Sequence, residues 1–488
     1  MAGIWLNEDN SHYFFTRAEN AADPEKIREF IMQYKDTNVE RLFLSANSQK
    51  TSYPSEAGDV IYKDVEWDNP DRPNFRKWCT AVIKLEEAGI DLYSTWIGLC
   101  REIGVSPWMS MRMNDVHNVD NVDDPMHSSF YKNNLCYRRA MHRDEKWEDR
   151  QLNYLIKDVR EYHFGILKEY FEKFDFDGIE LDWMRFGNHF PVGYEDAGRE
   201  VLDEFMKRTR ELADEFGKMR GHKIEIAARV PVKPETAFDM GLDGVGWALA
   251  GYADCLIPSP FWHTSQEDIP VERWKRQVAG TGCKIAPCIE ICLRQYAFPK
   301  CKNEMQMNNM ETIRGAAVSF IDRGADAIYL FNYMDEQRFA YDNTTYHDII
   351  SETGDYEKMS SKRRRFILTF NDRRPEGTPS DEVLPYKLVK EKFTGFRLHT
   401  GNLQENEKRV ALLSFQGKSY MDNNDIRVYI NGKEAELNGP YEIRGPKPPD
   451  ALFAFEVPKE ALKDGYQVIE LVALKDGLTV DWIEMLGK

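Results

Sequence analysis

The sequence predicts an α/β protein in which a (β/α)8 TIM-type barrel precedes a C-terminal antiparallel β-sandwich. Before about residue 360, eight short apolar runs alternate with helical stretches, which is typical of a parallel sheet with crossover helices. After that point the runs become short and alternating, with turn residues between them. We therefore predict a barrel over residues 1–362 and a sandwich over residues 363–488. A doubly wound open sheet is the alternative for the first part.

The predicted barrel strands are apolar runs bounded by polar residues or glycine. They cover residues 3–6, 39–45, 105–111, 177–182, 223–230, 254–258, 284–290 and 326–332. The first helix follows Asp23-Pro24, a cap with a first-turn proline. Further helices are predicted at residues 75–87, 152–174, 195–216 and 310–323, with Gly89, Gly217 and Gly324 as stop signals.

The predicted sandwich consists of six short runs, which cover residues 366–370, 409–414, 426–430, 452–457, 468–474 and 478–485. Turn pairs such as Asn431-Gly432 separate them. The few aromatic residues in these runs fit strand cores, so we favour a packing module over a glycan-binding one. The basic run 362–365 is interpreted as a solvated junction between the two domains.

Composition narrows the classes of partner. A net charge of -17 argues against nucleic acid or an anionic membrane as partner. The sequence contains no 18-residue apolar stretch that could span a membrane. The eight cysteines lack paired metal-site spacing and are predicted to be buried free thiols. The N-terminus reads as a strand and predicts no signal peptide, which leaves a cytoplasmic protein or a secreted or periplasmic one with its signal removed.

The segment 176–185 carries the strongest functional signal. It is an apolar β-type run with Glu180 and Asp182 two residues apart. Since a strand alternates its side chains, both acids point the same way, which in a parallel barrel is into the mouth. A structural ion pair or a strand-end cap is the alternative. Trp183 alternates away from the acids and is expected to pack in the core.

This run resembles the fourth-strand signature of (β/α)8 glycoside hydrolases. Asp177, Glu180 and Asp182 fill carboxylate positions of the family 18 chitinases, but Met184 stands where the catalytic glutamate of that family is found. In the register of the α-amylases, Asp182 takes the position of the nucleophile. Over about three quarters of its length, the chain also resembles the bacterial "family 10-like" glycosyl hydrolase barrels.

Glu290, at the end of the seventh predicted strand, is the second acid that we select. By resemblance to the retaining β-glycosidase barrels, an acid on strand four faces one on strand seven. An ion pair of Glu290 with Arg294 or Arg112 is the alternative. If the pairing with Asp182 fails, the second acid is to be sought among Asp115, Glu235 and Glu267.

Polar residues at the other predicted strand ends are candidates for substrate binding, because barrel enzymes build their sites where strands end and loops begin. They are Asn7, Glu8, Asp9, His12, Asn47, Arg112, Asn114, Asp115, His117, Arg185, Trp262, His263, Asn332 and Tyr333. Segment 113–150 is a long loop without clear secondary structure. Its Asp115, Asp120, Asp123 and Asp124 suggest a solvated acidic loop more than a calcium site.

These patterns predict a glycoside hydrolase that cleaves a poly- or oligosaccharide with two carboxylates and needs no metal or cofactor. Asp182 is favoured as nucleophile, with Glu290 as acid/base and Glu180 in support; the reverse order of Asp182 and Glu290 stays open, as does the anomeric outcome. The alternative is a non-catalytic carbohydrate-binding protein on a degenerate barrel. The histidines lack the spacing of a metal-dependent hydrolase, and residues 293–300 offer no glycine-rich phosphate loop.

Overall fold

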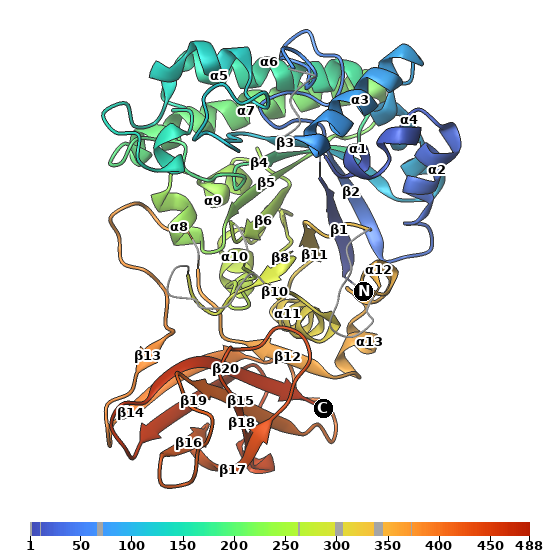
Figure 1. The fold of residues 1–488 in the computed structure, drawn as a ribbon. Helices are drawn as coiled ribbons and strands as arrows, with labels where there is room; N and C mark the ends of the chain where they lie inside the picture. The colour runs from blue at the N-terminus through green and yellow to red at the C-terminus, as the bar shows by residue number, and fades with distance from the viewer. Residues whose placement is uncertain are drawn as a thin grey trace.

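The computed structural model describes residues 2–9, 11–65, 72–261, 264–297, 306–335, 345–371 and 373–488. Its first part is a closed parallel barrel (Figure 1). The barrel strands are β1 (Gly3–Glu8), β2 (Val39–Ser45), β3 (Ser106–Arg112), β4 (Gly178–Asp182), β5 (Glu225–Pro231), β6 (Cys255–Ser259), β7 (Lys284–Ile285), β8 (Cys288–Glu290) and β11 (Ala327–Phe331). All pairings among them are parallel, which confirms the predicted barrel.

Strand seven of the barrel is divided into β7 and β8. Pro287 lies between the two segments and has no N–H to donate to a ladder. Segment β7 pairs with β6, and β8 pairs with β11, so the two segments together close the ring. The prediction of one continuous strand over residues 284–290 is therefore right in position but misses this interruption.

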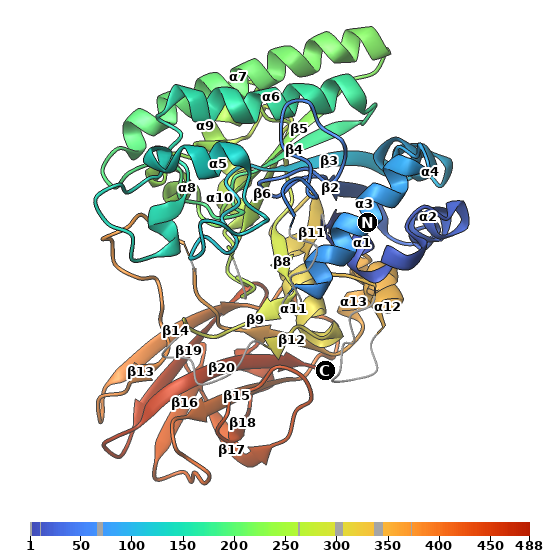
Figure 2. The same ribbon diagram turned by 45° about the horizontal axis from the view of Figure 1, so that its top comes forward.

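Helices cover the outside of the barrel. They are α1 (His12–Thr16), α2 (Pro24–Met32), α3 (Pro73–Glu87), α4 (Leu92–Glu102), α5 (Ser129–Asn133), α6 (Lys157–Lys173), α7 (Glu195–Arg220), α8 (Pro234–Asp239), α9 (Gly244–Leu249), α10 (Val271–Gln277), α11 (Met310–Asp322), α12 (Tyr346–Glu352) and α13 (Tyr356–Ser360). Figure 2 shows α6 and α7 side by side on one flank of the barrel. None of the described helices is long and apolar enough to cross a membrane.

The end of α7 differs from the prediction. Gly217 was expected to stop this helix, but the helix continues to Arg220, and Gly221 in the left-handed conformation (φ 78°) caps it. Gly217 instead provides a close approach, since a Cβ there would lie 2.9 Å from the backbone oxygen of His222. Gly217 is therefore needed for close packing in the last turn of α7, and Gly221 marks the end of the helix.

Alternate residues of the barrel strands face the interior. Ile4 and Leu6 belong to the large core under the helices, whereas Trp5 belongs to a separate interior cluster. The other members of the interior cluster are Phe43, Trp108, Ala227, Cys255, Ile257, Ala286, Cys288, Ala327, Tyr329 and Phe331. The barrel is therefore filled with side chains below its mouth.

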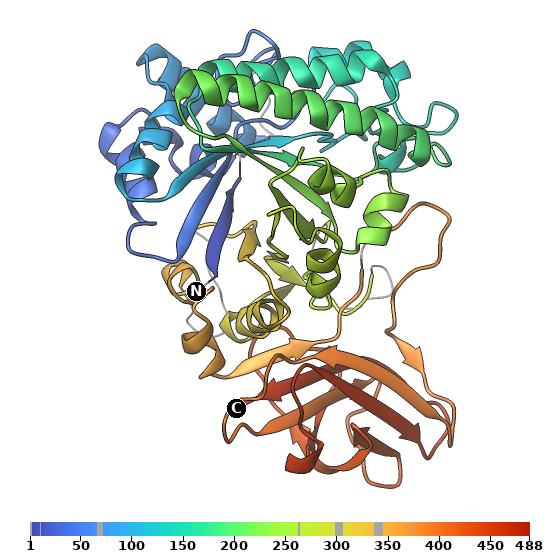
Figure 3. The ribbon, with the colours of Figure 1, turned by 180° about the vertical axis from the view of Figure 1, so that it is seen from behind.

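The C-terminal part is a two-layered antiparallel β structure, which confirms the predicted fold class (Figure 3). Its strands are β12 (Arg364–Ile367), β13 (Tyr386–Lys387), β14 (Phe393–His399), β15 (Arg409–Phe415), β16 (Ile426–Ile430), β17 (Lys433–Tyr441), β18 (Leu452–Glu456), β19 (Tyr466–Ala473) and β20 (Thr479–Gly487). Strand β17 joins the layers, because it pairs with β18 in one and with β16 in the other.

The barrel and the C-terminal layers share a buried contact. Strand β15 is buried on both faces: Ala411 and Leu413 face the sandwich core, while Val410 and Leu412 cluster with Leu293 of the barrel. Helix α11 approaches β12 closely, and a Cβ on Gly315 would lie 1.9 Å from the backbone oxygen of Arg365.

The basic run 362–365 is solvated only in its first half, where Lys362 is exposed and Arg363 is half-buried, so the interpretation as a solvated junction is wrong for the second half. Arg364 and Arg365 are buried in β12. The Arg365 guanidinium bonds both oxygens of Glu484, at 2.6 and 2.8 Å, and Arg364 pairs with Glu407 at 2.6 Å. Because side chains alternate along β12, Arg364 and Arg365 point to opposite faces, and each meets a different buried acid. The linear sequence does not reveal these pairs.

Candidate functional site at the barrel mouth

The candidate site is the ring of inward-facing side chains nearest the C-terminal ends of the barrel strands. Strand alternation places eight inward-facing residues near these ends, one from each strand of the barrel. These residues are Asn7, Ser45, Arg112, Asp182, Arg229, Ser259, Glu290 and Phe331. The ring therefore contains both acids that the sequence selects as a pair, one on β4 and one on β8.

Glu180 lies one step deeper than the ring and is fully buried. Its carboxylate accepts hydrogen bonds from the hydroxyls of Ser110, at 2.5 Å, and Tyr329, at 2.7 Å. Burial, and after it the charge of Asp182, raise the pKa of Glu180 to about 7. Glu180 is therefore a carboxyl group that exchanges its proton near neutral pH.

Asp182 is held by three donors at the end of β4. Its Oδ1 accepts from the backbone N–H groups of Met184, at 3.1 Å, and Arg185, at 2.8 Å. Its Oδ2 accepts from Arg229 Nη1 at 2.7 Å. Asp182 is thus a strand-end cap and an ion-pair member, and its Oδ2 has one hydrogen-bond partner among the described residues.

A network of charges surrounds Arg112 at the end of β3. The Arg112 guanidinium binds Asp9 and, at 3.0 Å, Asp115. His117 Nδ1 lies 2.6 Å from Asp115, and its Nε2 lies 3.2 Å from Arg185 Nη2. Burial would raise the pKa of Asp9, but Arg112 and Arg185 outweigh it and hold that pKa below its usual value. Burial would likewise raise the pKa of Asp115, but His117 and Arg112 outweigh it and hold that pKa below its usual value.

Glu290 occupies the corresponding position at the end of β8. It is 1% exposed, its Oε2 accepts from the Cys292 N–H at 2.7 Å, and its Oε1 accepts from Asn332 Nδ2 at 3.2 Å. Asn332 adopts a positive φ of 63°, which asparagine tolerates better than most residues. The Tyr333 hydroxyl donates to the backbone oxygen of Glu290 at 3.4 Å. Glu290, Asn332 and Tyr333 therefore form one local unit.

Several of the selected residues lie away from the ring. Glu8 faces the helix side of β1, where it bonds His12 and Tyr34. Asn47 bonds the Arg112 backbone through its Oδ1 and Nδ2, and Asn114 fastens the Leu152 backbone in the same way. These three side chains support strand ends and loops rather than facing the mouth.

Asp177 and two of the reserve acids are also outside the site. Asp177 lies at the opposite end of β4, where it bonds Arg101 and Ser106 at 2.8 Å each. Glu235 forms an exposed pair with Arg273. Glu267 is buried against the backbone of Ile367 in β12. Of the reserve acids, only Asp115 borders the mouth, and it is already paired.

An aromatic cluster stands in the loops beyond the ring. Trp147 stacks on Phe261 at a centroid distance of 5.3 Å, and Phe186 contacts both rings. The predicted platform of Trp262 and His263 lies outside the described residues. Trp183 packs against Tyr154 and Trp247 in the core, as alternation predicts.

The loop 113–150 is more ordered and less solvated than expected. It contains α5 and the short helices η2 (Leu135–Tyr137) and η3 (Trp147–Arg150). Asp115 and Asp124 are buried and paired with arginines, whereas Asp120 and Asp123 are exposed. Among the described residues, no group of histidine, cysteine, aspartate and glutamate could hold a metal ion. The cysteines in the described part are free, and all but Cys136 are buried.

Six residues of the site were not singled out by the sequence: Ser45, Ser110, Arg229, Ser259, Tyr329 and Phe331. Ser110 and Tyr329 bond Glu180, Arg229 bonds Asp182, and Ser259 accepts from Arg229 Nε at 3.2 Å. Arg229 carried a usable signal, since a lone arginine in the apolar run of strand five needs a buried partner. Its register opposite Asp182 appears only once the strands are paired.

Four buried polar atoms at this mouth have no partner among the described residues. Within the described part of the chain, Asn7 Oδ1, Ser45 Oγ, Arg185 Nε and Arg229 Nη2 are buried and make no hydrogen bond. Buried polar groups are normally paired, so each of these four atoms is a candidate to bond water or a ligand. The mouth therefore has unused hydrogen-bonding atoms beside its acids.

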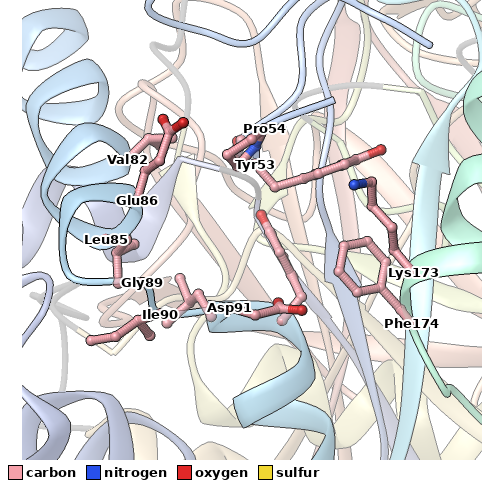
Figure 4. Close-up of a pocket in the computed structure, with 13 residues that line it drawn as sticks. Tyr53, Pro54, Val82, Leu85, Glu86, Gly89, Ile90, Asp91, Lys173 and Phe174 are labelled. Atoms are coloured by element: carbon pink, nitrogen blue, oxygen red, sulfur yellow. The ribbon is translucent and has the colours of Figure 1, made fainter. Parts of the chain in front are cut away.

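A separate cavity of about 260 Å³ lies on the outside of the barrel (Figure 4). Apolar side chains such as Val82, Leu85 and Phe174 line much of it. Its charged neighbours are already engaged, since Glu86 bonds Tyr62 and Asp91 caps α4 through the Ser94 N–H. This cavity contains none of the selected site residues.

Comparisons with known proteins give remote likenesses. No protein-family model and no curated protein matches the sequence. The matching solved structures include alpha-L-fucosidase isoenzyme 2 from Paenibacillus thiaminolyticus, with TM-score 0.44 and 13% identity, covering 74% of this chain and 49% of that chain. The GH36 alpha-galactosidase AgaB from Geobacillus stearothermophilus gives TM-score 0.39 and 12% identity, with 97% and 55% covered.

Alpha-L-fucosidase isoenzyme 1 from Paenibacillus thiaminolyticus gives TM-score 0.33 and 13% identity, with 96% of each chain covered. The present chain spans about half the length of the first two structures. The three neighbours are glycosidases, but TM-scores below 0.5 carry no argument about the chemistry of this chain. The functional conclusion must therefore come from the site itself.

Proposed function

We propose that the protein is a glycoside hydrolase that cleaves an oligo- or polysaccharide with Asp182 and Glu290. The observation that carries this proposal is the ring at the barrel mouth. It combines two carboxylates on strands three positions apart in the eight-stranded barrel with buried polar atoms that have no partner. Barrel enzymes place their chemistry at this end of the strands, and glycoside hydrolysis requires two such acids.

The contacts of Asp182 suit the role of nucleophile. Three donors fix the orientation of its carboxyl group, and among the described residues Oδ2 bonds only Arg229. In the first step this oxygen attacks the anomeric carbon while the bond to the leaving oxygen breaks. Glu290 gives its proton to that oxygen, and then takes a proton from the water that displaces Asp182.

Glu180 is proposed to tune this chemistry without touching the sugar. It lies one step deeper than Asp182, and its proton state adds or removes a negative charge beside the nucleophile. With Glu180 ionised, the positive charge that develops on the sugar ring is stabilised more strongly. Turnover is therefore expected to rise as the pH increases through about 7.

A non-catalytic carbohydrate-binding protein is the second candidate. Asp182 and Glu290 are each 1% exposed, and Asp182 already accepts three hydrogen bonds. A site whose acids only hold arginines in place would also bind sugar through its unpartnered polar atoms. The two candidates differ in whether the bound glycan is cleaved.

The proposal is tested with a panel of defined neutral and acidic oligosaccharides. Products are followed by chromatography, and the anomer formed first is read by proton NMR. Hydrolysis with retained configuration is expected, since it follows from a nucleophilic Asp182. Binding of a glycan without cleavage at any pH from 5 to 9 would instead establish the binding protein.

A further inference from the structure

We propose that Glu376 and Arg373 are positioning residues for the barrel mouth, although they lie beyond the barrel in the sequence. Both belong to the connector, residues 368–385 between β12 and β13, all of which except residue 372 is described. The inference rests on the proposed function for what the mouth does. The positioning itself can be measured without substrate, so the inference and the proposed function can fail separately.

The connector leaves the sandwich, runs along the barrel beside α8 and then returns to the sandwich (Figures 1 and 3). Leu368 and Leu384, near its two ends, pack in the sandwich core. Between them, Asp381 pairs at 2.5 Å with Lys233, which follows β5. Because the loops that follow the strands of a parallel barrel lie at its mouth, the connector reaches the rim of the candidate site.

Glu376 joins two loops at this rim. Its Oε2 lies 2.9 Å from Arg139 Nη2, and its Oε1 lies 2.6 Å from Arg143 Nη2, both in the loop after β3. Arg139 also donates to the backbone oxygen of Phe190, in the segment after β4, at 3.3 Å, and Arg143 binds Asp149 at 2.8 Å. Burial would raise the pKa of Glu376, but the hydrogen bonds from Arg139 and Arg143 outweigh it and hold that pKa below its usual value. The carboxylate is therefore ionised, and its two bonds persist, at neutral pH.

Arg373 packs on the aromatic cluster of the same rim. Its Cζ lies 3.9 Å from the ring centroid of Phe261, which follows β6, and 5.1 Å from that of Trp147, in the loop after β3. The Arg373 residue is only 8% exposed, and the attraction between a cation and a ring is stronger when both are removed from water. The connector therefore holds this stack of rings as well as the two arginines.

Phe186 links the aromatic cluster to the mouth. Its ring contacts those of Trp147, at 5.4 Å, and His117, at 4.8 Å, and it directly follows Arg185. Phe186 has a φ of +65°, whereas the other described non-glycine residues with positive φ are aspartate, asparagine or glutamate. A bulky residue keeps such a backbone only where its surroundings impose it. The rings that the connector holds therefore help to set the positions of Arg185 and His117.

The test is amide hydrogen exchange on the full chain, read by mass spectrometry. In Glu376→Gln, peptides from residues 139–151 and 183–190 should lose protection roughly 3- to 30-fold, as expected when a carboxylate bonded to two arginines is removed. Peptides from β15 and β16 in the sandwich should not change. Arg373→Leu should affect the same two regions, because it removes the other contact of the connector with this rim.

Glu434→Gln is the matched control, because Glu434 pairs with Arg427 at 3.8 Å on the exposed surface of the sandwich. It should change neither region. Glu376→Asp keeps the charge and should restore part of the protection that Glu376→Gln loses. On any glycan that the wild type cleaves, Glu376→Gln should raise KM roughly 3- to 30-fold and change kcat less, because the proposed catalytic acids stay in place while the rim loosens.

The outcomes separate positioning from a general role in stability. Unchanged protection in both connector variants overturns the inference. An equal loss of protection in the barrel and the sandwich also overturns it, since the connector would then stabilise the whole molecule without positioning the mouth. Local loss of protection with unchanged KM and kcat overturns it as well. If the wild type cleaves no glycan, the proposed function fails, and a local loss at residues 183–190 still supports the positioning.

Discussion

At the scale of single residues, Glu180 and Asp182 lie two positions apart on β4 but have different hydrogen-bond partners. Asp182 is bonded by an arginine and two backbone N–H groups, whereas Glu180 is bonded by two hydroxyls. Cationic and backbone donors favour the ionised form, while burial beside another acid favours the neutral form. One strand therefore presents an acid that an arginine holds and, below it, a carboxyl group whose pKa is raised to about 7.

Glu180→Gln tests this difference through stability. The unfolded chain ionises Glu180 near pH 4.5, while the native protein keeps that proton until about pH 7. The raised pKa therefore lowers the free energy of unfolding between these values, by roughly 3 kcal/mol for a shift of this size. Urea unfolding should show this loss in the wild type and a smaller loss in Glu180→Gln. Equal loss in both proteins would contradict the account.

The sequence could predict part of the site from alternation alone. Glu180 and Asp182 were placed in the mouth because residues two apart share a strand face, and Glu290 by the count of strands. The partners Arg229 and Tyr329 could not be predicted, since their contacts depend on register between strands distant in sequence. Glu8 was misjudged because the last residue of a strand can face either the mouth or the helices.

At the scale of elements, hydrophobic patterning located the barrel strands closely. The runs 39–45 and 426–430 match β2 and β16 in full. Strands β14 and β17 were missed, because their exposed residues and glycines do not form apolar runs. The division of strand seven at Pro287 and the stop of α7 depend on local backbone geometry, which a pattern of apolar residues does not encode.

Helix α11 offers a test of how closely elements approach. Gly315→Ala should destabilise the protein by several kcal/mol, because its Cβ would meet the backbone oxygen of Arg365 and an element would have to shift. Gly98→Ala in α4 is the matched control, since its Cβ would meet nothing within 4 Å. That change should stabilise the protein by about 0.5 to 1 kcal/mol through helix propensity. Similar effects of the two substitutions in thermal unfolding would contradict the packing described.

At the scale of the whole molecule, the barrel and the C-terminal layers are joined by a buried apolar contact. Strand β15 is buried on both faces, and Leu293 of the barrel packs within the cluster on its outer face. Separating the parts would expose this apolar surface to water, at about 25 cal/mol for each Å². The division at residue 362 remains a prediction about folding units, and the contact argues that the units depend on each other.

Calorimetry tests that dependence. One unfolding transition is expected for the full chain, and Gly315→Ala should move the whole transition to lower temperature because Gly315 lies at the contact. Two well-separated transitions, with only one moved by the substitution, would show that barrel and sandwich unfold independently.

The most direct test of the central claim is the hydrolytic rate of Asp182→Asn against Asp177→Asn, on any glycan that the wild type cleaves. Both substitutions remove one carboxylate from the same segment, but Asp177 lies at the end of β4 away from the mouth. We predict that Asp182→Asn lowers kcat/KM by at least roughly 10³ with the fold retained by circular dichroism, while Asp177→Asn keeps most activity. An Asp182→Asn protein that retains most of its activity would contradict the account.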